Sequence, residues 1–207
     1  MLRDFRLYVI IDLEVLKGRD SLKVAQGAVA GGADVIQLRG KASTAKELAE
    51  AGRAMRGLIK KDEALFIVND RPDIALAVGA DGVHLGQDDL PVADARSILG
   101  RERIIGLSTH SLEQASDAQE SGADYIGVGP VFSTPTKPGY KAVGLDLISK
   151  VKKINGIPFV AIGGIDESNI SDVIAAGADK VAVVRAVCGA EDVMGATKKL
   201  KDKLKRI

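Results

Sequence analysis

The sequence has few of the residues on which several classes of protein depend. Its single cysteine, Cys188, rules out an intramolecular disulfide and fits a reducing compartment. This cysteine lies in an apolar stretch, where inert packing is its expected role. There is no tryptophan, and aromatic residues make up only 3% of the chain, which leaves little material for stacking nucleic-acid bases.

An excess of charge of one sign is also lacking, because 29 basic residues almost balance 28 acidic ones. The resulting net charge of +1 gives no electrostatic reason to expect nucleic acid or an anionic membrane as a partner. No uncharged apolar run approaches the roughly 18 residues that a transmembrane helix needs. The first residues carry charges where a signal peptide would be apolar. We therefore expect a soluble, cytoplasmic protein.

The chain does contain a repeated phrase, Gly-Ala-Asp, which occurs four times before a short apolar run. Each copy stands between a segment with helical periodicity and one with the character of a buried strand. Glycine suits the left-handed position just after a helix end. The copies recur at roughly twice the length of one strand–helix unit, about 25–30 residues in a compact barrel. Each copy therefore marks every second strand, and the copies begin at Gly32, Gly79, Gly122 and Gly177.

Predicted strands and helices alternate along the 207 residues, which is the pattern of the (β/α)₈ or TIM barrel. The alternative, an open doubly wound sheet, would need an edge and a topological switch that nothing in the sequence marks. No linker divides the chain, so we predict a single domain over residues 1–207, ending in one amphipathic helix. A helix starting at Thr44 has the Thr-x-x-Glu spacing of a capping box. The strands are predicted at residues 7–11, 33–38, 64–68, 82–85, 104–107, 125–128, 158–162 and 181–184.

Polar side chains gather where the predicted strands end, which is where such barrels carry their chemistry. Some of them are cationic and some are carboxylates, a combination that suits a polyanion held together with a divalent metal ion. A Gly163-Gly164 turn before a helix lets backbone N–H groups approach an anion. The residues concerned are Gln37, Arg39, Lys41, Asn69, Asp70, Gln87, Asp88, Asp89, Ser108, Thr134, Thr136, Lys137, Gly164 and Arg185.

Each of these features also has a purely structural interpretation. Arg39 and Lys41 could be surface charges, and the loop that contains Thr134 and Lys137 could be an ordinary turn. Asp70, like the Asp88-Asp89 pair, could cap the helix that follows it. The two glycines could form a tight turn without a ligand. His84, inside a predicted strand, is expected to be packed, whereas His110 near a strand end could be a base.

Taken together, six short motifs resemble the thiamine-phosphate synthase family, and they occur in that family's order over essentially the whole chain. They are Gln37-Leu38-Arg39-Gly40-Lys41, Val68-Asn69-Asp70, His84-Leu85-Gly86-Gln87-Asp88-Asp89, Gly106-Leu107-Ser108-Thr109-His110, Gly127-Val128-Gly129-Pro130-Val131-Phe132 with Thr134-Pro135-Thr136-Lys137, and Ala161-Ile162-Gly163-Gly164-Ile165.

The resemblance implies a Mg²⁺-dependent transferase of thiamine biosynthesis. In that reaction the nitrogen of hydroxyethylthiazole phosphate attacks the methylene carbon of hydroxymethylpyrimidine pyrophosphate, and pyrophosphate leaves. By the same resemblance Asp70 and Asp89 are the metal ligands. Gln37, Arg39, Lys41, Asn69, Ser108 and Lys137 contact the pyrimidine pyrophosphate, and Arg39, Ser108 and Lys137 are the catalytic candidates. Thr134, Thr136, Gly164 and the Val184-Arg185 turn form the thiazole phosphate site.

One position departs from the family pattern, because Arg185 stands where a small hydroxyl residue is common. Arg185 could bind the same phosphate through its side chain, or it could signal a changed specificity. Two other functions stay open: a thiazole tautomerase-like isomerase, for which His110 is the proton-transfer candidate, and a non-catalytic sensor of a phosphate ligand. An isomerase has no pyrophosphate to expel, so it would not need the set made of Arg39, Lys41, Asn69, Asp70, Asp89, Thr136 and Lys137. A sensor of a monophosphate would not need the Asp70 and Asp89 pair. The partners expected are phosphorylated small molecules, and a homo-oligomer is possible.

Overall fold

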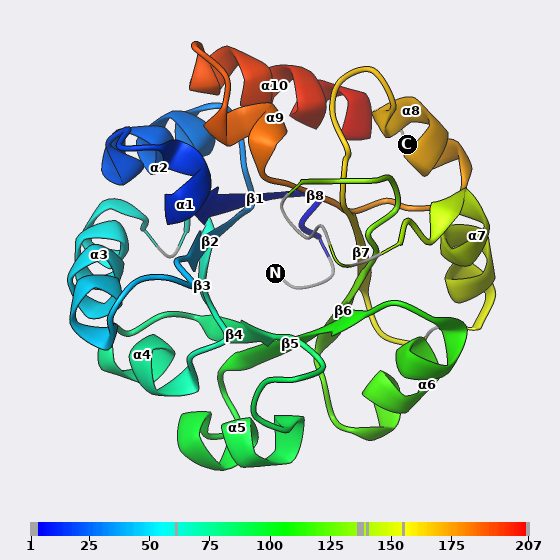
Figure 1. Ribbon diagram of the computed structural model, residues 1–207, viewed down its shortest axis with the longest axis horizontal. Helices are drawn as coiled ribbons and strands as arrows, with labels where there is room; N and C mark the ends of the chain where they lie inside the picture. Colours follow the sequence, from blue (N-terminus) through cyan, green and yellow to red (C-terminus); the bar gives the residue numbers. More distant parts are fainter. Residues whose placement is uncertain (1–3, 61, 136–138, 140, 155, 206–207) are drawn as a thin grey trace.

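The computed structural model describes residues 4–60, 62–135, 139, 141–154 and 156–205. In these ranges the strands form a closed parallel barrel in sequence order, and β8 pairs back with β1. The helices surround the barrel on its outer side, as the view along the barrel axis shows (Figure 1). The predicted TIM barrel is therefore confirmed, and the open sheet is wrong.

The elements follow the predicted alternation closely. The strands are β1 (Leu7–Asp12), β2 (Val35–Arg39), β3 (Leu65–Asn69), β4 (Gly82–Leu85), β5 (Ile104–Thr109), β6 (Tyr125–Val128), β7 (Phe159–Ile162) and β8 (Val181–Val183). The helices are α1 (Leu13–Leu16), α2 (Ser21–Ala30), α3 (Ala45–Leu58), α4 (Pro72–Ala77), α5 (Val92–Leu99), α6 (Leu112–Glu120), α7 (Gly144–Ile154), α8 (Ile170–Ala175), α9 (Arg185–Cys188) and α10 (Val193–Leu204).

Two short helices are absent from the sequence prediction. Asp12 ends β1 and caps α1, because its side chain accepts hydrogen bonds from Glu14 N and Val15 N. The single final helix expected after β8 is wrong. The chain forms α9, passes Gly189 at the C-cap, and starts again at α10, where the Asp192 side chain accepts from a backbone N–H. The predicted capping box at Thr44 is confirmed.

The glycines of the four Gly-Ala-Asp copies all adopt the left-handed backbone conformation that the sequence predicts. A residue with a side chain would be strained there, so glycine is the natural choice. Each glycine follows a helix and lets the chain turn directly into an even-numbered strand. The φ values are 94° at Gly32, 69° at Gly79, 84° at Gly122 and 109° at Gly177.

Three of the four aspartates of this phrase bind the starts of β1, β3 and β5 at the amino-terminal face of the barrel. Asp81 Oδ2 accepts from Phe66 N in β3 at 2.7 Å and from Arg56 Nη1 in α3 at 2.9 Å. This contact joins the start of β3, the helix α3 before it and the phrase that follows it. Asp34 and Asp124 repeat the arrangement, with Leu7 N and Lys201 Nζ as donors to Asp34, and Ile105 N and Arg96 Nη2 as donors to Asp124.

Apolar side chains pack in two layers. The larger layer lies between the strands and the helices and includes Met55, Phe66, Ile126 and Cys188, all buried. The smaller layer fills the barrel interior and includes Tyr8 and Tyr125. The Cys188 thiol donates to Ile10 O at 3.2 Å, and burial raises its pKa to about 11, which agrees with the packing role expected for it. Among the described residues, no helix has the length and apolar character needed to cross a bilayer.

Candidate active site

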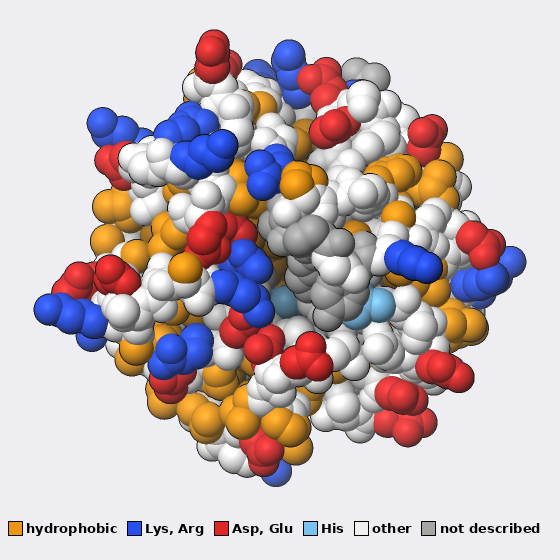
Figure 2. All heavy atoms as spheres, in the orientation of Figure 1, with side chains coloured by type: hydrophobic (Ala, Val, Ile, Leu, Met, Phe, Trp, Pro, Cys, Tyr) orange, Lys and Arg blue, Asp and Glu red, His pale blue; other side chains and the backbone are white. Residues whose placement is uncertain are grey.

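A cavity of about 440 Å³ opens at the carboxyl ends of the strands, directly above the interior layer. This volume lies within the range of about 300–1,000 Å³ that is typical of small-molecule sites. Figure 2 shows basic and acidic side chains side by side at one edge of the barrel mouth, and histidine atoms border the central opening. The sequence-predicted residues on the cavity wall are Gln37, Arg39, Asn69, Ser108, Thr134, Gly164, Val184 and Arg185, together with His110.

Arg39 is held in place by carboxylates and is not a free surface charge. Its Nη1 forms an ion pair with Asp12 Oδ2 and lies 3.3 Å from Glu14 Oε2. Asp12 is only 1% exposed, and the backbone N–H groups of α1 bind its other oxygen. The guanidinium is therefore positioned at the end of β2, where it reaches the cavity wall.

Lys41 and Asp70 meet at the rim, next to the cavity. Lys41 Nζ lies 2.9 Å from Asp70 Oδ2, and this hydrogen bond raises the pKa of the lysine. The backbone of Asp70 is left-handed, with φ of 61°, and its N–H donates to His84 O at 2.8 Å. Asp70 therefore turns out of the line of β3 and carries its carboxylate to the β4 side of the rim.

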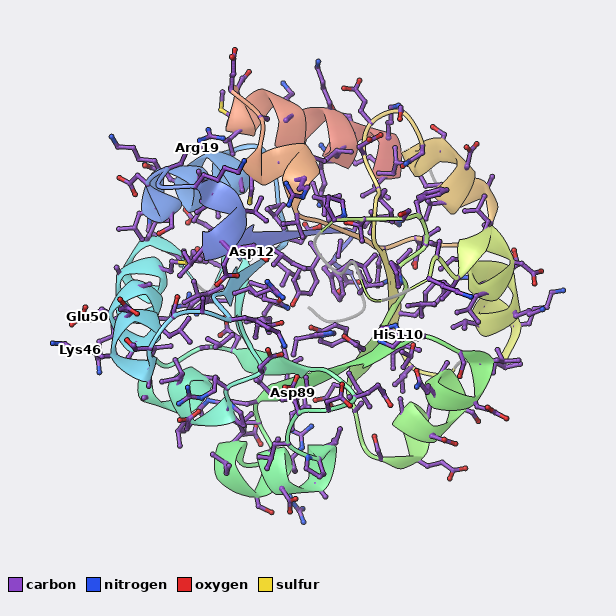
Figure 3. The ribbon with its side chains drawn as sticks, in the orientation of Figure 1. Asp12, Arg19, Lys46, Glu50, Asp89 and His110 are labelled. Atoms are coloured by element: carbon purple, nitrogen blue, oxygen red, sulfur yellow. The ribbon has the colours of Figure 1, made fainter. Side chains whose placement is uncertain are left out.

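Asp70 and Asp89 form a carboxylate pair. Burial, together with a side-chain hydrogen bond with Asp89, raises the pKa of Asp70 to about 6 against the opposing effect of Lys41. Asp89 comes from the turn after β4, where its Oδ2 accepts from Gly86 N at 2.6 Å. Figure 3 shows Asp89, Asp12 and His110 around the central opening, whereas Lys46 and Glu50 lie on the outer side of α3.

The helix-capping interpretation of these aspartates is wrong. The residue that caps α4 is Arg71, and no side chain makes a capping hydrogen bond there. The residue that caps α5 is Pro91, again without a side-chain hydrogen bond. Asp70 and Asp89 therefore do not have capping as their role.

The carboxylate pair fits a divalent cation. Two carboxyl groups that share a hydrogen bond need either a proton or a cation between them. Mg²⁺ is usually held by one or two carboxylates, with phosphate oxygens and water completing its six positions. Within the described ranges there is no cluster of three or more His, Cys, Asp or Glu side chains that could hold a metal ion without such help. Asp70 and Asp89 are thus suited to a metal that arrives with a phosphorylated ligand.

Gly163 and Gly164 bring backbone close to the cavity on the opposite side. A Cβ at Gly163 would lie 2.5 Å from the Cα of Pro130, and one at Gly164 would lie 2.8 Å from Ser133 O. Both glycines have positive φ, 105° and 65°. The close approach between this turn and the loop after β6 therefore requires glycine, and it leaves main-chain groups facing the cavity next to Arg185.

A chain of polar side chains crosses the barrel beneath the cavity, and three of its members were not anticipated as site residues. Gln37 Nε2 donates to Tyr8 Oη at 2.6 Å, and Tyr8 Oη lies 3.0 Å from Tyr125 Oη. The imidazole of His84 continues the chain, with Nδ1 2.9 Å from Tyr125 Oη and Nε2 2.9 Å from Ser108 Oγ. All five side chains line the cavity, so His84 is part of its floor.

His110, the sequence candidate for a base, also lines the cavity. Its Nδ1 lies within hydrogen-bonding distance of the Gly129 carbonyl, which can only accept, so Nδ1 carries a proton. The backbone N–H of His110 donates to Gln114 Oε1 at 2.7 Å. Two other predicted site residues, Thr136 and Lys137, lie outside the residues that the structure describes.

Comparisons with known proteins agree with this arrangement. A family model described as thiamine monophosphate synthase matches residues 7–187. The thiamine-phosphate synthase of Halalkalibacterium halodurans is 48% identical over 195 residues, 94% of this chain and 92% of that protein. That of Chloroflexus aurantiacus is 47% identical over 199 residues, 96% of this chain and 92% of that protein.

A solved structure leads to the same family. The thiamine phosphate pyrophosphorylase from Pyrococcus furiosus superposes with a TM-score of 0.90 at 42% identity, covering 98% of this chain and 96% of that one. Such identity over nearly the full length is far more than a shared fold requires. The chain therefore belongs to the thiamine monophosphate synthase family and is an enzyme, a transferase.

Proposed function

We propose that this enzyme joins hydroxymethylpyrimidine pyrophosphate to hydroxyethylthiazole phosphate, releasing thiamine phosphate and pyrophosphate, and that it needs Mg²⁺. The observation that carries this proposal is the grouping of Lys41 with the Asp70–Asp89 pair at the rim. A site for a single phosphate would gain nothing from two carboxylates. A site that expels pyrophosphate needs a cation to neutralise the leaving group.

The chain's own residues would divide the work as follows. Asp70 and Asp89 would hold the metal, which supplies charge neutralisation for the departing oxygens. Arg39, Lys41 and Lys137 would bind the pyrophosphate, with Ser108 nearby. The positive charges of Arg39, Lys41 and Lys137 would stabilise the negative charge that grows on the pyrophosphate oxygen as its bond to the methylene carbon breaks. Arg39 is suited to this role because Asp12 fixes its guanidinium before any ligand binds.

The second substrate would lie across the cavity. Gly164 and the Val184-Arg185 turn are the proposed phosphate site there, supported by the close approach of backbone at the glycine pair. The loop residues Thr134 and Thr136 would assist. Gln37 and Asn69 would orient the pyrimidine from the opposite wall. Holding the two reactants together would supply much of the acceleration, because it replaces a bimolecular encounter with a bound pair.

An assay with purified protein tests the proposal. With both substrates and Mg²⁺ we expect thiamine phosphate, with none formed in EDTA and recovery when Mg²⁺ is restored. Asp89→Asn should lose at least about a hundredfold in turnover, because one ligand of the charge-stabilising cation is weakened. The exposed neighbour Asp88 provides a matched control, since Asp88→Asn should keep nearly normal turnover. If no thiamine phosphate forms with both substrates in Mg²⁺, the proposed reaction is wrong.

The Asp89→Asn variant keeps a carbonyl oxygen that can accept from Gly86 N, so the turn after β4 should be retained. A circular dichroism spectrum and melting temperature close to those of the wild type would confirm this. If the folded variant were as active as the wild type, Asp89 would have no place in the metal site. Conversion of a thiazole tautomer without any pyrimidine substrate would instead support the isomerase alternative.

A further inference from the structure

The buried side chains of Gln37, Tyr8, Tyr125, His84 and Ser108 form a chain of hydrogen bonds. The donors in this chain can all point toward Ser108 or all toward Gln37. Each hydroxyl has a single proton to donate, so the choice at one end sets the choice at all the others. Burial raises the pKa of both Tyr8 and Tyr125 well above the ordinary value, so both phenols are neutral at physiological pH. The direction therefore decides which nitrogen of His84 carries its proton.

The contacts favour one direction. The amide nitrogen of Gln37 faces Tyr8, and an amide nitrogen can only donate. Tyr8 must then donate its own hydroxyl hydrogen to Tyr125 Oη, because in the described part of the protein the Tyr8 hydroxyl contacts no other acceptor. Tyr125 in turn donates to His84 Nδ1 at 2.9 Å. With Nδ1 as acceptor, the proton of the neutral imidazole sits on Nε2 and is donated to Ser108 Oγ.

We propose that Gln37 sets the tautomer of His84 across the barrel, through the two tyrosines, and thereby makes the Ser108 hydroxyl a hydrogen-bond donor into the cavity. Ser108 Oγ accepts a hydrogen bond from the imidazole, so its own hydroxyl hydrogen is directed to a ligand atom with a lone pair. His84 is in these terms a positioning residue, which acts through Ser108.

The packing around His84 fixes the ring as this role requires. A Cβ at Gly106 would lie 2.5 Å from His84 Nδ1, and one at Gly127 would lie 3.2 Å from His84 Cε1. The imidazole therefore fits against two strands that lack side chains at these positions. The Tyr125 ring lies 5.4 Å away, centroid to centroid, on the same side of the barrel floor. The imidazole has little room to turn, so proton placement can change only through its hydrogen-bond partners.

Nitrogen-15 NMR of the free protein tests the proposal directly, because protonated and unprotonated imidazole nitrogens resonate far apart. The chain has only two histidines, so the spectrum is simple. We expect His84 in the Nε2–H form. His110 serves as an internal control of the opposite kind, since its Nδ1 faces the Gly129 carbonyl. An Nδ1–H form of His84 would mean that the chain runs from Ser108 to Gln37, and would overturn the proposal.

A variant three side chains away from His84 along the chain provides a sharper test. Gln37→Glu has nearly the same shape, but an ionised carboxylate can only accept. At alkaline pH we expect it to reverse every hydrogen bond in the chain and to move the His84 proton from Nε2 to Nδ1, while His110 stays unchanged. In the double variant Gln37→Glu/Tyr125→Phe the chain is cut, so the substitution at residue 37 should no longer affect His84.

The outcomes separate this inference from the proposed reaction. The role of Ser108 toward substrate rests on the proposed function. The tautomer of His84 is measured without substrate, so its test does not depend on that function. If Gln37→Glu is folded and leaves the His84 spectrum as in the wild type, the coupling is absent and the inference is wrong. If Gln37→Glu does not fold, the wild-type tautomer and its response to Tyr125→Phe alone still decide the matter, with a mixed tautomer expected in that variant.

Discussion

Asp70 combines an uncommon backbone conformation with a partly buried carboxyl group. A positive φ is tolerated best by glycine, asparagine and aspartate, so the choice of residues at this position is narrow. The carboxyl lies between Lys41, which favours its ionised form, and burial together with Asp89, which favour its protonated form. Burial and Asp89 together outweigh Lys41, so the pKa of Asp70 is raised. Without a bound cation, the ionised pair is a source of instability.

This balance predicts a pH-dependent difference between the wild type and Asp70→Asn. The folded-state pKa of about 6 lies above the ordinary value of 3.8, so the contribution of Asp70 to stability is largest below pH 4 and is lost as the pH rises through 6. Relative to the wild type, Asp70→Asn should therefore gain about 1–2 kcal/mol in the free energy of unfolding between pH 4 and pH 7, allowing for solvent screening.

Urea denaturation of both proteins in EDTA, at a series of pH values, would measure this difference. Asn keeps the left-handed backbone acceptable, so the comparison isolates the charge. Asp88→Asn, at an exposed position beside the same site, should show no such trend. A constant difference between wild type and Asp70→Asn over the whole range would contradict the prediction.

At the level of single residues, the sequence could locate most of the polar cavity wall but not the inner members of the hydrogen-bonded chain beneath it. Gln37, Arg39, Asn69 and Ser108 follow from their place at strand ends, because parallel strands in a barrel end at one face. Tyr8 and Tyr125 are spaced 117 residues apart, and only the closed barrel brings their hydroxyl groups together. Neither strand shows any local sign of a polar partner. The one available clue was a hydroxyl-bearing aromatic residue in an otherwise apolar strand.

Among the elements, the Gly-Ala-Asp turns are where sequence and structure agree best. Their pattern is local, and a glycine after a helix needs no tertiary information to be recognised. The role of the aspartates is visible only in the structure. Asp34, Asp81 and Asp124 accept hydrogen bonds from backbone N–H groups at the starts of β1, β3 and β5. Short helices such as α1 could not be predicted, because four residues carry too little periodicity.

This arrangement predicts that Asp81→Ala is destabilising without harming catalysis. The substitution removes the carboxylate that accepts from Phe66 N and Arg56 Nη1, which should cost about 2–4 kcal/mol in the free energy of unfolding. Turnover measured well below the melting temperature should be normal, because the contact lies on the face opposite the cavity. Urea denaturation and the synthase assay would test the two parts separately.

The fourth copy provides a control for Asp81→Ala. The hydrogen bond of Asp179 in the described structure is to Lys180 Nζ, at 2.9 Å, and Asp179 side-chain oxygens receive no backbone N–H there. Asp179→Ala should therefore cost less than Asp81→Ala. Equal losses in the two variants would show that backbone hydrogen bonds are not what the aspartates contribute.

For the molecule as a whole, the last helix α10 packs against α2 at the side of the barrel where β8 pairs with β1. Gly31 is the C-cap of α2, and a Cβ there would lie 2.6 Å from Met194 O and 2.6 Å from Thr197 Cβ in α10. The two helices thus approach more closely at this point than any side chain would allow. The same contact places Lys201 of α10 beside Asp34.

We therefore expect Gly31→Ala to destabilise the whole barrel by about 1–3 kcal/mol, as overpacking of a close contact does. Gly57→Ala in α3 is the matched control, because a Cβ there meets no atom within 4 Å and alanine favours the helix. That variant should be neutral or more stable by up to about 1 kcal/mol. Thermal unfolding should show a lowered melting temperature in Gly31→Ala alone, and a Gly31→Ala protein as stable as the wild type would refute the packing argument.

The aspartate contacts also bear on the order in which a newly made chain can complete its parts. The donors to Asp81 and Asp124 all precede them by 15 to 28 residues, so these contacts can form soon after the residues leave the ribosome. Asp34 is different, because Lys201 lies 167 residues further along the chain. The first copy of the phrase to be synthesised is therefore the last to acquire its full set of partners, and it does so only when the final helix is released.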